Sequence, residues 1–354
     1  MLLNDPEVPG RFHNTLLVCL TLVIAAIAGL AAQSIHSPLP WMLGPLFAVA
    51  LLRMAGAPLR AIAGGRQAGQ WAIGTALGLY FTPAVLALLS ANLLLVSVIA
   101  GGALVVGLLC ALLTAALTSE DRPTAFFASL PGGASEMAVV AERFGGAVDR
   151  IAAAHALRVM LVVAVVPFGL SWSGAHGSDH YQPLATAVVP SLLPLVVAAS
   201  LGGVALLTAL RIGNAWVLGP LLGVGLATGF GMDLSALPGW VVNGGQLLIG
   251  CALGCRFSPE FFRAAPRFLA AATASALFAV GLGSLLAMAA AALSDSPVAT
   301  LVLAAAPGGV AEMCITAKVL QLGVPLVTVC HVLRVVLLTM GAPALYRLFL
   351  RLRP

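Results

Sequence analysis

Two glutamates stand in apolar segments, each directly after a Pro-Gly-Gly break. The first is Glu136 in LPGGASEMA (130–138), and the second is Glu312 in APGGVAEMC (306–314). Ionisable side chains at membrane depth are costly, and they mark ion or substrate pathways. Burial disfavours the charged form of a carboxyl group, so such a glutamate can exchange a proton. In the structural alternative, the carboxylate only stabilises the positive end of the helix that follows the break, or pairs with a buried arginine.

A second doubled motif places a histidine and an arginine three residues apart, on one face of a helix. It reads His155-Ala-Leu-Arg158 in the first copy and His331-Val-Leu-Arg334 in the second. The surroundings are apolar, so each guanidinium needs a carboxylate, a run of carbonyls or an anionic ligand. Each histidine can relay protons near neutral pH or hydrogen-bond between helices. One glutamate, one arginine and one neutral histidine per copy sum to zero charge, so these residues do not define the substrate's charge.

The breaks themselves are candidates for solute binding. A Pro-Gly-Gly break inside the membrane leaves backbone groups without helical partners, and it survives only where protein or a water-filled cavity covers it. The free N–H groups at the following helix start can hold an anion. We expect Gly132, Gly133, Gly308 and Gly309 to supply the tight turn and the close backbone approach.

A third doubled block, Gly-Gln…Ile-Gly-x-Ala-Leu-Gly-x-x-Phe-[Ser/Thr]-Pro, contains Gln70 and Gln246. Small residues at helical spacing let membrane helices approach closely, which favours a packing role for the block. The alternative is that the two glutamine side chains line a pore, because buried amides need partners.

The composition indicates a membrane protein. Of 354 residues, 61% are apolar and 8% are charged, whereas ordinary globular proteins carry about a quarter charged residues. Mean hydropathy is +1.07. The net charge of +5 comes from loops beside membrane segments, so we expect no nucleic-acid partner. The six cysteines lie in apolar segments without the spacing of a metal or disulfide site, and we expect no metal or cofactor and no enzymatic activity.

The sequence is duplicated in tandem. Trp41–Leu46 (WMLGPL) aligns with Trp216–Leu221 (WVLGPL), and the Pro-Gly-Gly breaks and the His/Arg motifs align 176 residues apart. Identities at a nearly constant offset over so long a stretch are the signature of repeated structure. We predict a first membrane repeat at 10–170, a periplasmic linker at 171–185 and a second membrane repeat at 186–348.

Each repeat holds six apolar segments. They are 14–33, 38–55, 67–88, 92–118, 123–143 and 150–172 in the first repeat, and 184–210, 214–230, 240–258, 266–293, 297–318 and 323–348 in the second. Lys and Arg collect in cytoplasmic loops. If the fifth segment of each repeat enters the membrane and returns, all but three of the 17 basic residues lie on the cytoplasmic side. The exceptions are Arg158 and Arg334 within membrane segments and Lys318 on the outer side.

This charge bias predicts the fold class: an all-α polytopic membrane protein with two inverted repeats of five transmembrane helices each. Each repeat also carries a re-entrant or broken Pro-Gly-Gly helix, and both termini are cytoplasmic. Paired broken helices in inverted repeats, meeting near the bilayer midplane, are typical of secondary transporters.

The doubled P-G-G-x-x-E-M motif with a later H-x-L-R resembles the AbrB-type bacterial inner-membrane proteins, a membrane family that should not be confused with the soluble transcription factor of the same name. The resemblance covers nearly the whole chain. It implies a distant relation to the cation/proton antiporter and anion transporter superfamily, and so the five-plus-five inverted fold. Such proteins also carry the labels ammonia monooxygenase and regulator of gene expression. Oxygen chemistry on copper or iron needs several converging ligands, and one histidine per repeat does not supply them.

We therefore expect a secondary active transporter of a small solute, coupled to protons or another cation, in the bacterial inner membrane. Its partners would be membrane lipid, a small-molecule or ion substrate and a second copy in a homodimer. The competing hypothesis is a membrane sensor or regulator that binds a ligand without moving it and acts indirectly on gene expression. The two differ in flux across sealed vesicles.

Overall fold

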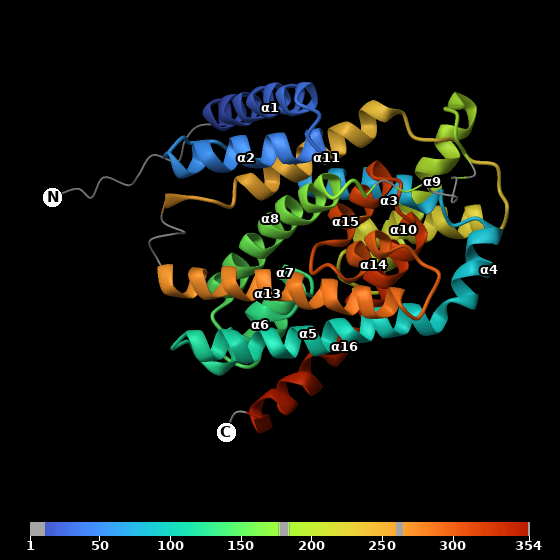
Figure 1. Cartoon of the computed structure of the whole chain (residues 1–354). Coiled ribbons are helices and arrows are strands. Elements are labelled where there is room, and N and C mark those ends of the chain that lie inside the picture. The colour runs from blue at the N-terminus through green and yellow to red at the C-terminus, as the bar shows by residue number, and fades with distance from the viewer. Residues whose placement is uncertain (1–10, 176, 178–182, 184, 260–264, 353–354) are drawn as a thin grey trace.

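The computed structural model describes residues 11–175, 177, 183, 185–259 and 265–352, and the described chain is helical throughout (Figure 1). The residues outside this description include Arg263, Arg353 and part of the expected linker at 171–185. The absence of strands among the described residues agrees with the predicted all-α membrane class.

The first repeat consists of five membrane elements and one interrupted segment. Its helices are α1 (Arg11–Ser34), α2 (Pro40–Met54), α3 (Gly65–Gly78), α4 (Pro83–Ala91), α5 (Leu93–Leu117), α6 (Arg122–Ser129), α7 (Ala134–Glu142) and α8 (Val148–Trp172). The break between α6 and α7 is the first Pro-Gly-Gly.

The second repeat follows the same order. After the 3₁₀ turn η1 (Pro190–Leu192), its helices are α9 (Leu193–Ala209), α10 (Ala215–Gly229), α11 (Gly239–Gly254), α13 (Pro266–Ala291), α14 (Val298–Ala305), α15 (Val310–Val319) and α16 (Val324–Leu352). Among the described helices, α1, α5, α8, the η1–α9 stretch, α13 and α16 are long and apolar enough to cross a bilayer alone. The α3–α4 pair makes a bent seventh, and α2 and α10 are shorter apolar helices.

The apolar segment predicted at 67–88 is not one element. α3 ends at Gly78, α4 begins at Pro83, and the two helices are bent by 86°. The Thr82 side chain accepts a hydrogen bond from the Val85 N–H at 3.3 Å, which caps the new helix. Proline at the first helical position suits such a start because it has no N–H to donate. The Thr-Pro pair was therefore the boundary signal within this segment.

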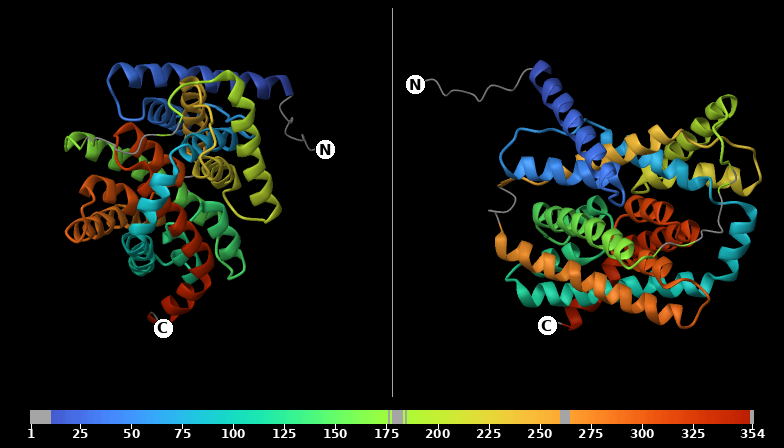
Figure 2. Two further views of the ribbon diagram at one scale, coloured as in Figure 1. Left: turned by 90° about the vertical axis from the view of Figure 1, so that its right-hand side faces the viewer. Right: turned by 45° about the horizontal axis from the view of Figure 1, so that its top comes forward.

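The helices form two bundles, and each bundle takes helices from both repeats. Bundle A contains α1, α2, α3, α9, α10 and α11, with α2 packed on α11 and α3 packed on both α10 and α11. Bundle B contains α5 to α8 and α13 to α16, with α5 lying along α13 and α16. The right-hand view of Figure 2 shows them as an upper and a lower layer, with α4 joining the layers at one side. The duplication therefore does not divide the protein into two separate halves.

Glycines allow the close helix contacts of bundle A, and these contacts recur between the repeats. A Cβ added at Gly250 of α11 would lie 2.5 Å from the carbonyl oxygen of Met42 in α2. At the equivalent positions, Gly74 of α3 packs against the carbonyl of Val217 in α10. Because equivalent pairs exchange partners, an approximate two-fold axis relates the repeats. The contacts agree with the packing role expected of this glycine block.

The first interrupted segment is a re-entrant hairpin. Thr124, at the start of α6, accepts a hydrogen bond at 2.7 Å from the backbone N–H of Ala147, just before α8. Next to them, Glu120 and Arg150 form a salt bridge. Since the chain enters and leaves at the same place, α6 and α7 enter the protein from the α5 C-terminal face and return to it.

The second interrupted segment is also a hairpin, and it enters from the other face. Gly323, between α15 and α16, lies against Thr300 at the start of α14, so this hairpin also starts and ends at one place. Residues of both ends share a surface hollow with Asn92 and Leu94, at the N-terminal end of α5. α5 has 25 residues and is about 37 Å long, so the two hairpin mouths lie on opposite faces. Because each interrupted segment starts and ends at one place, neither is a broken helix that crosses the membrane. Because the two mouths lie on opposite faces, the repeats are inverted.

Candidate functional site

The end of α6 is held by side chains from α8. Arg158 donates from Nη1 to the carbonyl of Leu130 at 2.7 Å and from Nη2 to that of Gly132 at 3.3 Å. His155 Nε2 lies 2.9 Å from the carbonyl oxygen of Phe127, and its Nδ1 lies 3.1 Å from Arg158 Nη2. A carbonyl only accepts and a guanidinium only donates, so His155 is the neutral tautomer with its proton on Nε2.

The second hairpin repeats this arrangement. Arg334 of α16 donates from Nη1 to the carbonyl of Ala306 and from Nη2 to that of Gly308 at 2.6 Å. His331 Nε2 lies 2.8 Å from the carbonyl oxygen of Leu303. The same backbone positions are therefore bound in both repeats, and the His/Arg motif and the Pro-Gly-Gly break form one structural unit.

These contacts show which kind of group binds the buried arginines. Arg158 is 6% exposed and Arg334 is 2% exposed, and both bind a run of carbonyls rather than a carboxylate. Each charge lies at the negative C-terminal end of a short helix, α6 or α14, where it is stabilised by the helix dipole. Among the described residues neither arginine forms a salt bridge with a glutamate. The first role of the motif is to satisfy the broken backbone, which lipid cannot do.

The two glutamates lie where the second helix of each hairpin begins. Glu136 and Glu312 are both in the first turn, of α7 and α15 respectively. Each carboxylate folds back over the glycine before its helix, Gly133 or Gly309, and a Cβ there would overlap it. This is the arrangement in which a carboxylate stabilises a helix N-terminus. Glu312 is 5% exposed, whereas Glu136 is half-buried and also lies against Gly213.

A cavity of about 60 Å³ lies where both hairpin tips meet bundle A. The backbone of the two breaks forms one side of it, and α3, α10 and the end of α11 form the other. Its polar lining consists of Arg66, Gln70, His155, Asn214, Arg256, Glu312 and Arg334. The two breaks therefore meet at a single cavity, although their hairpins enter from opposite faces.

The structure brings together most of the candidates from the sequence. Gln70, His155, Glu312, Arg334 and the four glycines Gly132, Gly133, Gly308 and Gly309 line the cavity. Glu136, Arg158, His331 and Gln246 are not lining residues. Glu136 stays beside the first tip, against Gly133, while Arg158 lies behind that hairpin. His331 and Gln246 are buried within the bundles.

Three polar lining residues were missed by sequence reasoning: Arg66, Asn214 and Arg256. In the sequence analysis, the two arginines served only as loop charges that indicate the membrane orientation. Neither has a basic counterpart in the other repeat, because Val242 corresponds to Arg66 and Tyr80 corresponds to Arg256. A search restricted to doubled residues therefore cannot find them. The available signal was that both follow a glycine-rich stretch at the edge of a membrane segment.

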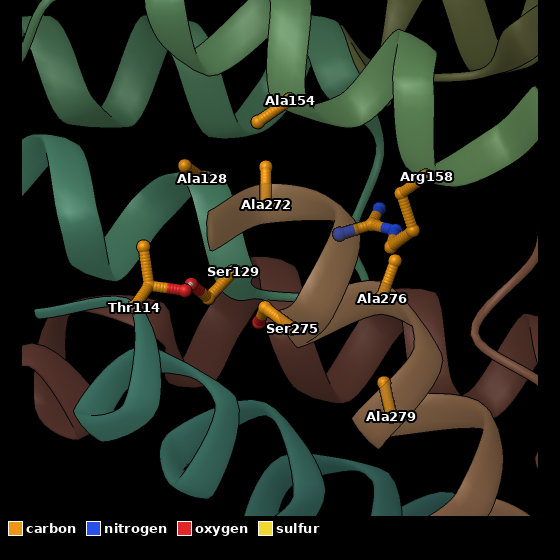
Figure 3. A pocket seen from close by; sticks show the side chains of 9 residues that line it. All are labelled: Thr114, Ala128, Ser129, Ala154, Arg158, Ala272, Ser275, Ala276 and Ala279. Carbon is orange, nitrogen blue, oxygen red and sulfur yellow. Dashed lines mark hydrogen bonds between the residues drawn. The ribbon is translucent and has the colours of Figure 1, made fainter. Parts of the chain in front are cut away.

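A second, much smaller cavity of about 10 Å³ lies behind the first hairpin (Figure 3). Thr114, Ser129 and Ser275 line it with the Arg158 guanidinium, and the Ser129 hydroxyl donates to Thr114 Oγ1 at 2.8 Å. Arg158 Nε is buried without a hydrogen-bond partner. The space suffices for about one water molecule.

The sequence pattern of the family described as "Transition state regulatory protein AbrB" matches residues 41–350. The chain belongs to the AbrB family. The match covers both repeats, from the start of α2 into α16, and so includes both hairpins and the cavity between them.

Two relatives of this AbrB-family chain align with it over more than nine-tenths of both sequences. One is "Uncharacterized protein YhjN" of Bacillus subtilis (strain 168), 24% identical over 353 residues, covering 92% of this chain and 91% of the relative. The other is "Putative regulator AbrB" of Escherichia coli (strain K12), 23% identical over 332 residues, covering 92% and 94%. The resemblance expected from the doubled motifs is thus confirmed at the level of the family.

Proposed function

We propose that the chain is a secondary active transporter of a small solute in the bacterial inner membrane. The observation that carries the proposal is that two inverted hairpins, entering from opposite faces, line one cavity between two bundles. Discontinuous helices in inverted repeats commonly form solute and ion sites near the bilayer midplane. Rocking of bundle B against bundle A would open the cavity to each face in turn.

Several features suit such a movement. The Arg158 and Arg334 contacts tie each hairpin to its own bundle, so a tip moves together with α8 or α16. The glycine contacts make bundle A a closely packed body. The extensive helix packing lies within each bundle, which suits a movement of one bundle relative to the other.

Coupling to a proton or another cation is part of the proposal, with the carboxylates as carriers. Glu312 lies in the cavity lining and is buried, and Glu136 lies beside the first tip. We propose a transport role without enzymatic activity. By the positive-inside rule, the face with Arg66 and Arg256 is cytoplasmic.

The name of the Escherichia coli relative favours a second candidate, a membrane regulator that binds a ligand without moving it. The transporter and the regulator can be distinguished by the membrane face from which the cavity is accessible. This test does not require the substrate to be known. Val159 and Val335 are equivalent residues of α8 and α16, and both line the cavity. Each is replaced by cysteine in a chain whose six native cysteines are removed, giving Val159→Cys and Val335→Cys.

The two variants are labelled with a membrane-impermeant maleimide in right-side-out and in inside-out vesicles. A transporter is labelled from both faces, because the cavity opens to each. The exposed residues Arg267 and Asp295, near opposite ends of α13, provide the sidedness controls as Arg267→Cys and Asp295→Cys. Labelling of both cavity positions from one face alone would contradict alternating access and support the regulator.

A further inference from the structure

The cavity lining contains more basic side chains than acidic ones. Arg66, at the start of α3, and Arg256, just past the end of α11, both line it. Within the described chain neither forms a hydrogen bond or a salt bridge, although Arg256 interacts electrostatically with Arg66 and with Glu312. Two guanidinium groups thus face a cavity that contains one carboxylate, and their repulsion is only partly offset.

α7 and α15 both begin at the cavity, where Gly133 and Gly309 precede their first turns. The carboxylates of Glu136 and Glu312 already lie over these two N-terminal ends, so the positive charge without a partner in the lining is that of the arginines. Gln70 and Asn214 contribute amide groups that can donate hydrogen bonds to a bound solute.

A third arginine adds to the positive charge of the lining. Arg334 lines the cavity and is 2% exposed, and its Nη atoms bind the hairpin carbonyls. Because its partners are neutral carbonyls, its charge is not cancelled by a carboxylate.

We propose that the solute is a compact organic anion with a carboxylate group, bound between Arg66 and Arg256. This assignment rests on the transporter proposal for its biological meaning, but the binding itself does not. A guanidinium binds a carboxylate with two parallel hydrogen bonds, and two guanidiniums together also discriminate against amines. The cavity of about 60 Å³ favours a small anion over an extended one.

Glu312 then acts as a competitor of the anion. Glu312 lines the same cavity as Arg256, so its negative charge repels a bound anion and competes with it for the arginine. Neutralising Glu312 should therefore strengthen anion binding. A site for an organic cation would respond in the opposite way, since Glu312 is the one acidic residue in the lining that the structure describes.

The experiment measures binding to the purified full chain by thermal shift and calorimetry at constant ionic strength. The probes are the sodium salts of acetate, L-lactate and succinate, with methylammonium chloride as the cationic probe. A ligand that binds only the folded state raises Tm. We expect at least one carboxylate to stabilise the wild type and methylammonium to have no effect.

The variants test the assignment of residues. Arg66→Gln and Arg256→Gln should each weaken carboxylate binding roughly tenfold or more, because each removes charge-assisted hydrogen bonds. Glu312→Gln should tighten binding several-fold. Arg267→Gln is the matched control, since it removes a positive charge that is exposed on α13 and outside the cavity. Arg256→Lys keeps the charge and covers the case in which Arg256→Gln fails to fold.

The proposal is overturned if no carboxylate binds, or if binding is unchanged in Arg66→Gln, whether or not the Arg256 variant folds. Stabilisation by methylammonium that is lost in Glu312→Gln would indicate a cation site instead. Access from both faces in the labelling experiment, together with failure of all carboxylates, would reject the substrate class and retain the transporter.

Discussion

Arg334 donates a 2.6 Å hydrogen bond to the carbonyl oxygen of Gly308, the residue at which the second hairpin turns. The same guanidinium also binds the carbonyl of Ala306. A helix can end inside a membrane protein only if another group takes over its last carbonyls. The contact therefore explains why a Pro-Gly-Gly break and a buried arginine occur together in both repeats.

Removing this tether should destabilise the protein. Arg334→Gln loses two charge-assisted hydrogen bonds and leaves buried carbonyls without partners, which costs about 2–4 kcal/mol. We expect Tm in detergent to fall by several degrees. Arg351→Gln, at the exposed end of α16, should melt like the wild type. Equal melting of the two variants would show that the tip is held by other contacts.

Arg334→Lys refines the same test. A lysine keeps the charge, but it lacks the planar fork that reaches two carbonyls at once. We expect its Tm to fall between those of the wild type and Arg334→Gln. A lysine variant as stable as the wild type would mean that charge near the α14 terminus matters more than hydrogen-bond geometry.

The hairpin geometry can be tested by cross-linking. Thr124 and Ala147 are in contact at the first mouth. In a chain without native cysteines, Thr124→Cys with Ala147→Cys should form a disulfide on mild oxidation, detected by a mobility shift after cleavage between the two positions. If α6 and α7 together crossed the membrane, the two positions would lie about 30 Å apart and no bond would form.

The close helix contacts of bundle A predict a large difference between two glycines of one helix. Gly250→Ala places a Cβ 2.5 Å from the Met42 carbonyl oxygen, so α2 and α11 must separate, at a cost of about 1–3 kcal/mol. Gly244→Ala, also in α11, meets nothing within 4 Å and should not destabilise. Melting curves of the two variants give the comparison, and similar losses would argue against backbone contact.

Glu312 of α15 and Arg256, which follows α11, line one cavity between the bundles, where their opposite charges attract each other. Glu312→Gln removes this attraction and should favour separation of the bundles at the arginine-rich face. At constant pH, maleimide labelling of Val335→Cys should therefore be several-fold faster when Glu312→Gln is also present.

The control for this prediction is Glu136→Gln. Glu136 is half-buried, lies against Gly213 and is not a lining residue of the cavity, so we expect labelling of Val335→Cys to keep its original rate in Glu136→Gln. Faster labelling in Glu136→Gln but not in Glu312→Gln would assign the contact between the bundles to the first repeat.

The membrane class, the duplication and the inversion could be predicted from the sequence because each produces a pattern along the chain. Apolar segments follow from the thickness of the bilayer. The doubled Pro-Gly-Gly and His/Arg motifs were visible because equivalent structural positions in the two repeats kept the same residues. The asymmetry of the arginines around the fifth segment indicated re-entry, since a basic residue is costly to leave on the outer side.

Only the tertiary structure shows which groups bind the buried charged side chains and which residues share the cavity. Whether Arg158 binds Glu136 or the carbonyls of Leu130 and Gly132 depends on where a broken helix ends in space. Arg66 and Arg256 lie 190 residues apart and have no counterparts in the other repeat, so only the packing of α3 against α11 places them in one cavity. Local sequence sets the cost of each break and each buried charge, and the folded arrangement determines which groups offset it.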